Sequence, residues 1–194
     1  DTFQLLTQTS VFTANKMDVD SIALLEPILK KFTENYHIHF EEAENLRTIQ
    51  EQMLTHIEGY LVGPIVVNLG MTGMFHKYFM ESSFRADEFH KHPEAFAKIL
   101  DFFVHLGWFS KKNDNYQFTE DGFFFAKRAS AYGVTVSYLP MFKHIDSLLF
   151  GNASELRNIA KNEDEIHVNR EMNVWGSGGA HATYFKVIDD IIIE

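Results

Sequence analysis

The side chains best suited to chemistry occupy positions 166–185, near the C-terminal end of the sequence. This stretch combines glycines, which permit loops, with His, Arg, Asn, Trp and Tyr. His167 and His181 are candidates for a general acid or base, because an imidazole titrates near neutral pH. Arg170 is a candidate anchor for an anionic substrate group. The alternative for Arg170 is a surface salt bridge with Glu171 or with the acidic run just before position 166.

The run Gly-Ser-Gly-Gly-Ala at 176–180 invites comparison with a nucleotide-binding loop. Such loops open a helix directly after a buried strand, and an acidic residue follows about 20 positions later. Here the only apolar residues directly before the run are Val174 and Trp175, which are too few for a buried strand, and the sequence ends at Glu194. We therefore favour a tight turn into a final helix, with a substrate-facing loop as the other interpretation. Trp175 itself is of a type more often found in a core than in a site.

The composition limits the classes of partner. With 194 residues, 45% of them hydrophobic, the chain can bury a substantial core. A net charge of −10 disfavours the phosphate contacts on which nucleic-acid binding relies. The chain has no cysteine and no HExxH pattern, and its apolar runs are far shorter than the ~20 residues of a membrane span. We expect no nucleic acid, no metal and no membrane partner, and a cytoplasmic location.

Residues 90–128 predict a specific three-dimensional unit. After Pro93, apolar residues recur every three or four positions, which predicts a helix that ends at Gly107. Two short β-prone runs then flank the polar residues 110–115, which predict the turn of a hairpin. Thr119 is expected to cap the next helix. A helix packed under a small hairpin is the winged-helix arrangement.

The rest of the chain is expected to be helical. Further helices are predicted at 18–32, 41–60, 65–80, 136–150, 154–161 and in the last residues from 188. Gly63-Pro64 is expected to end the helix before it, and the glycines near 70–73 to divide the next one. The expected fold class is mainly α, a helical bundle containing a winged-helix-like unit with a small β-hairpin. We divide the chain into an N-terminal helical segment (1–62), a winged-helix-like helical lid (63–165) and a connecting segment (166–194).

Two parts of the sequence resemble known proteins. The order helix, Leu-Gly-Trp-Phe, polar wing, Tyr-Gln-Phe-Thr-Glu-Asp-Gly at 106–122 resembles the winged-helix region ahead of the catalytic domain in many S-adenosylmethionine-dependent methyltransferases. Residues 167–185 resemble the segment that leads into the catalytic domain in methyltransferases of polyketide synthase modules, notably the apratoxin-type starter-unit C-methyltransferases. The resemblance covers roughly residues 63–194. The chain departs from the family in having no strand followed by Gly-x-Gly-x-Gly and a downstream acidic residue.

The resemblance implies a helical lid over a Rossmann-like methyltransferase core. S-adenosylmethionine would be bound by a catalytic domain that is absent from this chain, and no cofactor is expected for the chain alone. The implied partners are that catalytic domain, an acyl carrier protein or a small-molecule acceptor, and a second copy of the chain in a homodimer. The residues expected to approach the acceptor are Asn169, Arg170, Trp175, Ser177, His181 and Tyr184. The alternative function is a winged-helix regulatory or protein-interaction module without enzymatic activity.

Overall fold

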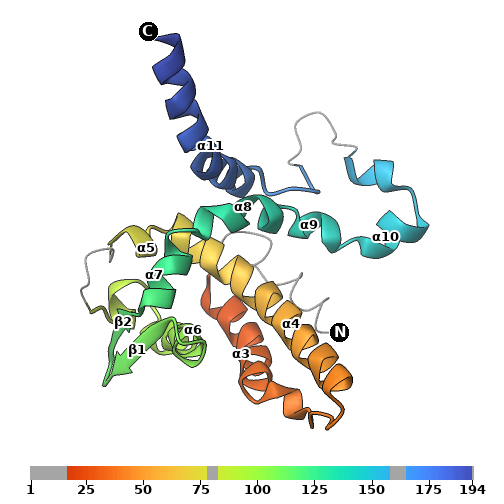
Figure 1. The fold of residues 1–194 in the computed structure, drawn as a ribbon, viewed down its shortest axis with the longest axis vertical. Helices are drawn as coiled ribbons and strands as arrows, with labels where there is room; N and C mark the ends of the chain where they lie inside the picture. Colours follow the sequence, from red (N-terminus) through yellow and green to blue (C-terminus); the bar gives the residue numbers. More distant parts are fainter. Residues whose placement is uncertain (1–16, 78–82, 158–164, 194) are drawn as a thin grey trace.

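The computed structural model describes residues 17–77, 83–157 and 165–193, and these form a mainly helical fold with one small hairpin (Figure 1). The first half of the chain contains α3 (Val19–Thr33), η1 (Asn35–His37), α4 (Glu44–Met71), α5 (Met74–Lys77), η2 (Ala86–Glu88) and α6 (Pro93–His105). The second half contains β1 (Phe109–Lys112), β2 (Asn115–Phe118), α7 (Glu120–Ala126), α8 (Ala129–Ser137), α9 (Leu139–Phe142), α10 (Ile145–Phe150), η3 (Ala153–Arg157) and α11 (Arg170–Ile192). The predicted fold class is confirmed.

The long helix α4 is the central support of the fold. It contacts α3, α8 and α11, and every residue from 61 to 70 is buried. Pro64 lies inside this segment, so the predicted break at Gly63-Pro64 is wrong. A proline costs about 3 kcal/mol in a helix interior, whereas burying one aliphatic side chain contributes about 1.5–3 kcal/mol. Because several such side chains flank Pro64, packing outweighs the lost backbone hydrogen bond.

The predicted end of this helix near 70–73 is confirmed. Thr72 is the C-cap residue of α4, and its backbone N–H donates to the Asn68 carbonyl, while the Gly73 N–H donates to the Gly70 carbonyl. Gly73 follows with a φ of +80°, a conformation that favours glycine. The chain then re-enters a helix as α5.

The winged-helix unit forms as predicted, with a tighter hairpin. Phe109 pairs with Phe118 and Lys112 with Asn115 in an antiparallel register, so that the polar residues 110–112 extend the strand. The turn is therefore confined to Asn113, which has a φ of +55°, and the residue after it. The predicted helix after Pro93 ends at His105 with Leu106 as its C-cap, and Gly107 follows with a φ of +79°. The predicted cap is also confirmed, since the Thr119 hydroxyl accepts a hydrogen bond from the Gly122 N–H.

Phe84 adds a short third pairing to the hairpin that the sequence pattern does not reveal. Its backbone exchanges two hydrogen bonds of 2.8 Å with Tyr116. The Phe84 ring is 0% exposed and packs against Phe109, Tyr116 and Phe118. This aromatic cluster joins the wing to the helical core.

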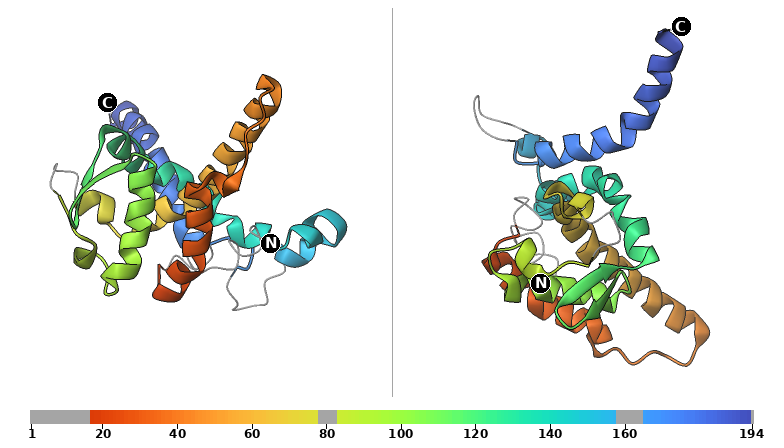
Figure 2. Two further views of the ribbon diagram at one scale, coloured as in Figure 1. Left: turned by 90° about the horizontal axis from the view of Figure 1, so that it is seen from below. Right: turned by 90° about the vertical axis from the view of Figure 1, so that its left-hand side faces the viewer.

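The last elements leave the body of the fold in different directions. The predicted stretch 136–150 is divided into the end of α8, α9 and α10, and Gly151 is the C-cap of α10 as predicted. The predicted helix at 154–161 appears as η3, and its last residues lie outside the described part of the chain. Figures 1 and 2 show that α9 and α10 extend from one end of α8, while α11 crosses α8 and then projects from it. Among the described helices, none has the length and apolar character needed to cross a membrane.

One substitution tests the packing of the hairpin against α7. A Cβ added to Gly122 would lie 2.0 Å from the Trp108 carbonyl oxygen, so the backbone must move to accept it. We expect Gly122→Ala to lower the free energy of unfolding by about 3 kcal/mol or more, as measured by urea denaturation. Gly59 in α4 is the matched control, because a Cβ there meets nothing within 4 Å. Gly59→Ala should leave stability unchanged or raise it by up to ~1 kcal/mol; equal effects of the two substitutions would contradict the packing described.

Candidate functional site

The first turn of α11 is fixed to the end of α8 by a polar contact. The backbone N–H of Asn169 donates to the Ser137 carbonyl at 2.8 Å, and the Asn173 amide donates to the Ser137 hydroxyl at 2.9 Å. Ser137 is 0% exposed, so these bonds lie inside the protein. The Asn169 side chain accepts a hydrogen bond from the Met172 N–H at 3.0 Å and caps the helix. In this structure Asn169 therefore caps α11 and attaches its first turn to α8.

The glycine-rich run 176–180 lies inside α11, so the predicted tight turn into a final helix is wrong. The physical reason is a close crossing with α8. A Cβ on Gly176 would lie 2.7 Å from the Val134 nitrogen, and a Cβ on Gly133 would lie 2.8 Å from the Gly176 Cα. A Cβ on Gly179 would lie 2.6 Å from the Ser130 hydroxyl oxygen. The two helices approach backbone to backbone, which small residues alone permit.

The crossing has a signal in the sequence. Ser130 and Gly133 are three residues apart, and so are Gly176 and Gly179. Residues at this spacing lie on one face of a helix. Two matching pairs of small residues indicate two helix faces that can meet, and the prediction of a turn at 176–180 overlooked them.

The Trp175 ring packs beside the crossing of α8 and α11, next to Gly70 of α4 and Gly133 of α8. A Cβ on Gly70 would lie 2.9 Å from the Trp175 ring, and a Cβ on Gly133 would lie 3.0 Å from it. The ring is half-buried and packs against the core of the fold, and Met172, one turn earlier, is fully buried. Trp175 therefore joins α4, α8 and α11.

Arg170 forms a salt bridge with the acidic run, which is the alternative that the sequence left open for this residue. Its Nε donates to the Glu165 carboxylate at 2.6 Å, and its Nη2 donates to the other oxygen of the same carboxylate. This bidentate hydrogen bond lowers the pKa of Glu165 and raises the pKa of Arg170. The Arg170 side chain is exposed to solvent and the Glu165 side chain is half-buried. A substrate anion at Arg170 would have to compete with Glu165.

The remaining predicted site residues lie further along α11. Ser177 is half-buried near the crossing, whereas His181 and Tyr184 are exposed in the second half of α11. The His181 ring contacts the Phe185 ring edge to face, with 6.0 Å between centroids. Along a straight helix the distance from Arg170 to Tyr184 is up to about 21 Å. The six residues thus share one helix without forming one cavity here, and their role towards an acceptor stays a prediction.

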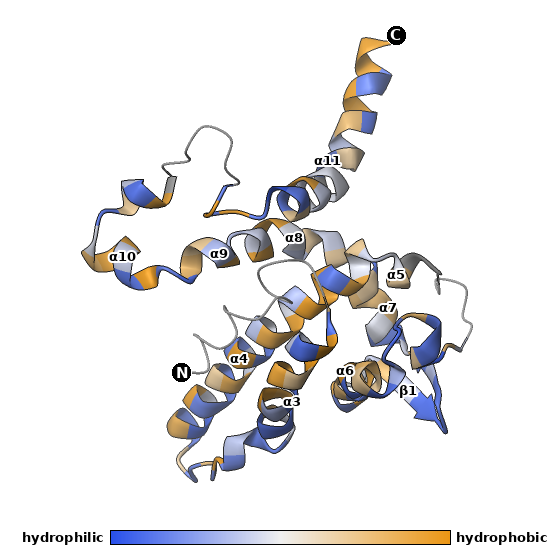
Figure 3. Cartoon of the chain, turned by 180° about the vertical axis from the view of Figure 1, so that it is seen from behind, coloured by the Kyte–Doolittle hydropathy of each residue, from blue (hydrophilic) through white to orange (hydrophobic). Residues whose placement is uncertain are grey.

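The projecting half of α11 carries an uncovered apolar face. Tyr184, Phe185, Ile188, Ile191 and Ile192 are 46–74% exposed. At 100° per residue these positions lie on one side of the helix, and Lys186, Asp189 and Asp190 lie on the other. Figure 3 shows this alternation of apolar and polar residues up to the C-terminal end. A face of this kind is typical of a helix that packs against another surface.

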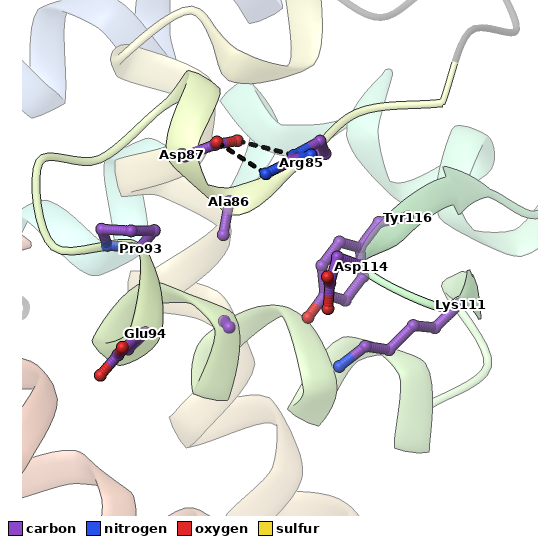
Figure 4. Close-up of a pocket in the computed structure, with 9 residues that line it drawn as sticks. Arg85, Ala86, Asp87, Pro93, Glu94, Lys111, Asp114 and Tyr116 are labelled. Atoms are coloured by element: carbon purple, nitrogen blue, oxygen red, sulfur yellow. Dashed lines mark hydrogen bonds and ion pairs between the residues drawn. The ribbon is translucent and has the colours of Figure 1, made fainter.

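A surface pocket of about 380 Å³ lies elsewhere, between η2, the start of α6 and the hairpin (Figure 4). Its cations are already paired. Arg85 binds Asp87 through two hydrogen bonds of 3.1 and 2.9 Å, and Lys111 donates to Asp101 at 2.7 Å. Tyr116 donates to the same Asp101 carboxylate at 2.8 Å. The contacts of Lys111 and Tyr116 with Asp101 hold the wing against α6. The mixed charges of the pocket indicate no single class of ligand.

Metal ligands are not brought together in the described parts of the chain. Within residues 17–77, 83–157 and 165–193, no three His, Asp or Glu side chains are grouped in a way that would hold a metal ion.

The Arg170–Glu165 pair is expected to make the stability of the fold depend on pH. Because the pKa of Glu165 is lowered in the folded chain, its pairing stabilises the fold above the pKa of the unfolded state and is lost as the pH falls through the folded-state pKa. An NMR titration of the Glu165 carboxyl should give a midpoint below that of an ordinary glutamate. Arg170→Gln should raise this midpoint, and Lys186→Gln, which removes a charge from the same helix, should not. A Glu165 midpoint that Arg170→Gln leaves unchanged would contradict the pairing.

Comparison with known proteins gives two matches. Residues 58–152 match the family model described as the AprA winged helix domain, and residues 165–194 match the family model described as the AprA MT2-like domain. No curated protein matches the chain. The first match includes the unit from α6 to α10, and the second includes all of α11. The suspected resemblance is confirmed: an AprA winged helix domain followed by residues of an AprA MT2-like domain is the arrangement expected for the N-terminal region of an apratoxin-type methyltransferase.

Proposed function

We propose that this chain is the N-terminal enclosing region of an S-adenosylmethionine-dependent methyltransferase. In this proposal the winged-helix unit covers the substrate, and α11 connects it to the methyltransferase domain of the same polypeptide. The observation that carries the proposal is the uncovered apolar face of α11, which lies within the residues that match the AprA MT2-like domain.

The apolar face supports a contact with a folded domain. Fully burying one Phe, Leu or Ile side chain contributes about 1.5–3 kcal/mol, and several such side chains lie together on α11 between 184 and 192. Left in water, this face favours association. A methyltransferase domain whose own residues include α11 would cover it at no cost in translational freedom, because the two parts belong to one chain.

The cofactor belongs to that domain in our proposal. In Rossmann-like folds the cofactor binds where parallel strands end and helices begin. The strands in the described part of this chain are β1 and β2, which pair as an antiparallel hairpin, together with the Phe84–Tyr116 bridge. The chain alone is therefore expected to bind S-adenosylmethionine weakly or not at all.

The acceptor in this proposal is a small or carrier-bound acyl group of polyketide biosynthesis. Enclosure by the winged-helix region would exclude water and hold the acceptor in place. His181 and Tyr184 lie on the projecting half of α11, where they would meet the methyltransferase domain. Arg170 would orient a carboxylate or carbonyl of the acceptor if the acceptor displaces Glu165.

Charge pairing weighs against the alternative of a DNA-reading winged helix. Lys98 on α6 is paired with Glu26, and Lys111 on the wing is paired with Asp101. A duplex reader needs such cations for phosphate. With a net charge of −10, the chain offers a poor surface for nucleic acid.

The test uses the chain together with the residues that follow it in its polypeptide. We expect S-adenosylmethionine to bind this extended protein in calorimetry and to bind the 194-residue chain at least tenfold more weakly. Ile188→Asp, which places a charge on the apolar face, should lower methyl transfer tenfold or more, because it weakens the contact between α11 and the methyltransferase domain.

Lys186→Asp is the matched control, since it introduces the same side chain on the opposite face of the same helix. It should keep activity within about twofold of the original. Failure of the extended protein to bind S-adenosylmethionine would refute the proposed function. Equal activity of the two variants would refute the role of the apolar face.

A further inference from the structure

The two halves of α11 have opposite environments. In the first half, Met172 is 0% exposed and Gly176 is buried against Gly133 of α8. In the second half, Ile188 and Ile192 are 46% and 74% exposed. The helix is continuous from Arg170 to Ile192, and Figure 2 shows that it bends between the half on α8 and the half that projects.

The glycines around the bend do not all have a packing reason. Gly176 and Gly179 are required by the crossing, because a Cβ on either would meet α8 at 2.7 Å or less. Gly178 is different, since a Cβ there would meet nothing within 4 Å. A glycine costs a helix about 1 kcal/mol relative to alanine. At Gly178 no close packing contact offsets this loss of helix stability.

Gly178 lies at the boundary between the two halves of α11, where a weaker helix can bend. A Cβ on Gly179 would clash with Ser130 of α8, and residues from Tyr184 onward are exposed. The sequence Ser-Gly-Gly-Ala at 177–180 therefore lies where the anchored half ends and the free half begins. Sharp bends in helices occur at glycine and serine pairs, where the backbone is least restrained by side chains.

We propose that Gly178 and Gly179 form a hinge in α11, about which the projecting half swings relative to the winged-helix unit. Gly179 allows the approach to α8, and Gly178 lowers the resistance of the helix to bending. The bending motion is expected in the 194-residue chain without any other domain. Its use rests on the proposed function, in which the swing would change the angle between the enclosing region and the methyltransferase domain and so open or close access to the acceptor.

Spin-label distances test the hinge in the 194-residue chain. The chain has no cysteine, so Glu171→Cys and Asp190→Cys give two unique labelling sites, one on each half of α11 and both exposed. On a straight helix these sites are about 28 Å apart, within the range of double electron–electron resonance. We expect a broad distribution that reaches shorter distances, because bending brings the two ends together.

Gly178→Ala is the decisive variant, because the methyl group fits without a clash and raises helix stability. It should narrow the distance distribution by about half and move it towards the straight-helix value. Gly59→Ala, a helical glycine of α4 with the same open space, should leave the distribution unchanged. A single narrow peak in the original chain, or a width that Gly178→Ala does not change, would overturn the hinge. Neither result bears on cofactor binding, so failure of the hinge is distinct from failure of the proposed function.

Discussion

The contact between Gly133 and Gly176 determines how the two family-matched parts of this chain are joined. At this point α8 and α11 approach so closely that a single added carbon would meet backbone atoms at less than 3 Å. Ser137 fixes the start of α11 to the end of α8, and Trp175 fills the space between α11 and α4. The winged-helix unit and the first half of α11 thus form one packed body. This contact fixes the position of the first half of α11, the helix that carries most of the candidate site residues.

The winged-helix unit acts in this arrangement as a scaffold. Its aromatic cluster around Phe84 and Phe103 binds the hairpin to α6, and Lys98 and Lys111 form ion pairs with Glu26 and Asp101. A surface of this kind has few free charges with which to read a nucleic acid. It instead provides a rigid support from which α11 projects.

Local patterns were sufficient to predict much of the fold. The helix after Pro93, the glycine that ends it, the hairpin and the Thr119 cap follow from rules that involve neighbouring residues only. The errors occurred at Pro64 and at the glycines of α11, where a local rule predicts a break. At both places the structure continues as a helix because contacts with distant residues outweigh the local preference. Those contacts join positions more than 40 residues apart, such as Gly133 and Gly176, and a single sequence does not display them.

The roles of the candidate site residues towards an acceptor stay a prediction. The stretch 166–185 does hold the unusual residues of the chain, but Asn169 caps a helix, Arg170 binds Glu165 and Trp175 packs against glycines. The side chains of His181 and Tyr184 remain exposed on the second half of α11. Residue types alone do not show which task a side chain has, because the task depends on its neighbours in the fold.

Hydrogen exchange along α11 tests the central claim that this helix is anchored in its first half and uncovered in its second. In the 194-residue chain, the amides of residues 174–177 should exchange at least tenfold more slowly than those of residues 184–192, because opening the first half requires breaking the crossing with α8. Equal protection of the two halves, or greater protection of the second, would contradict this account.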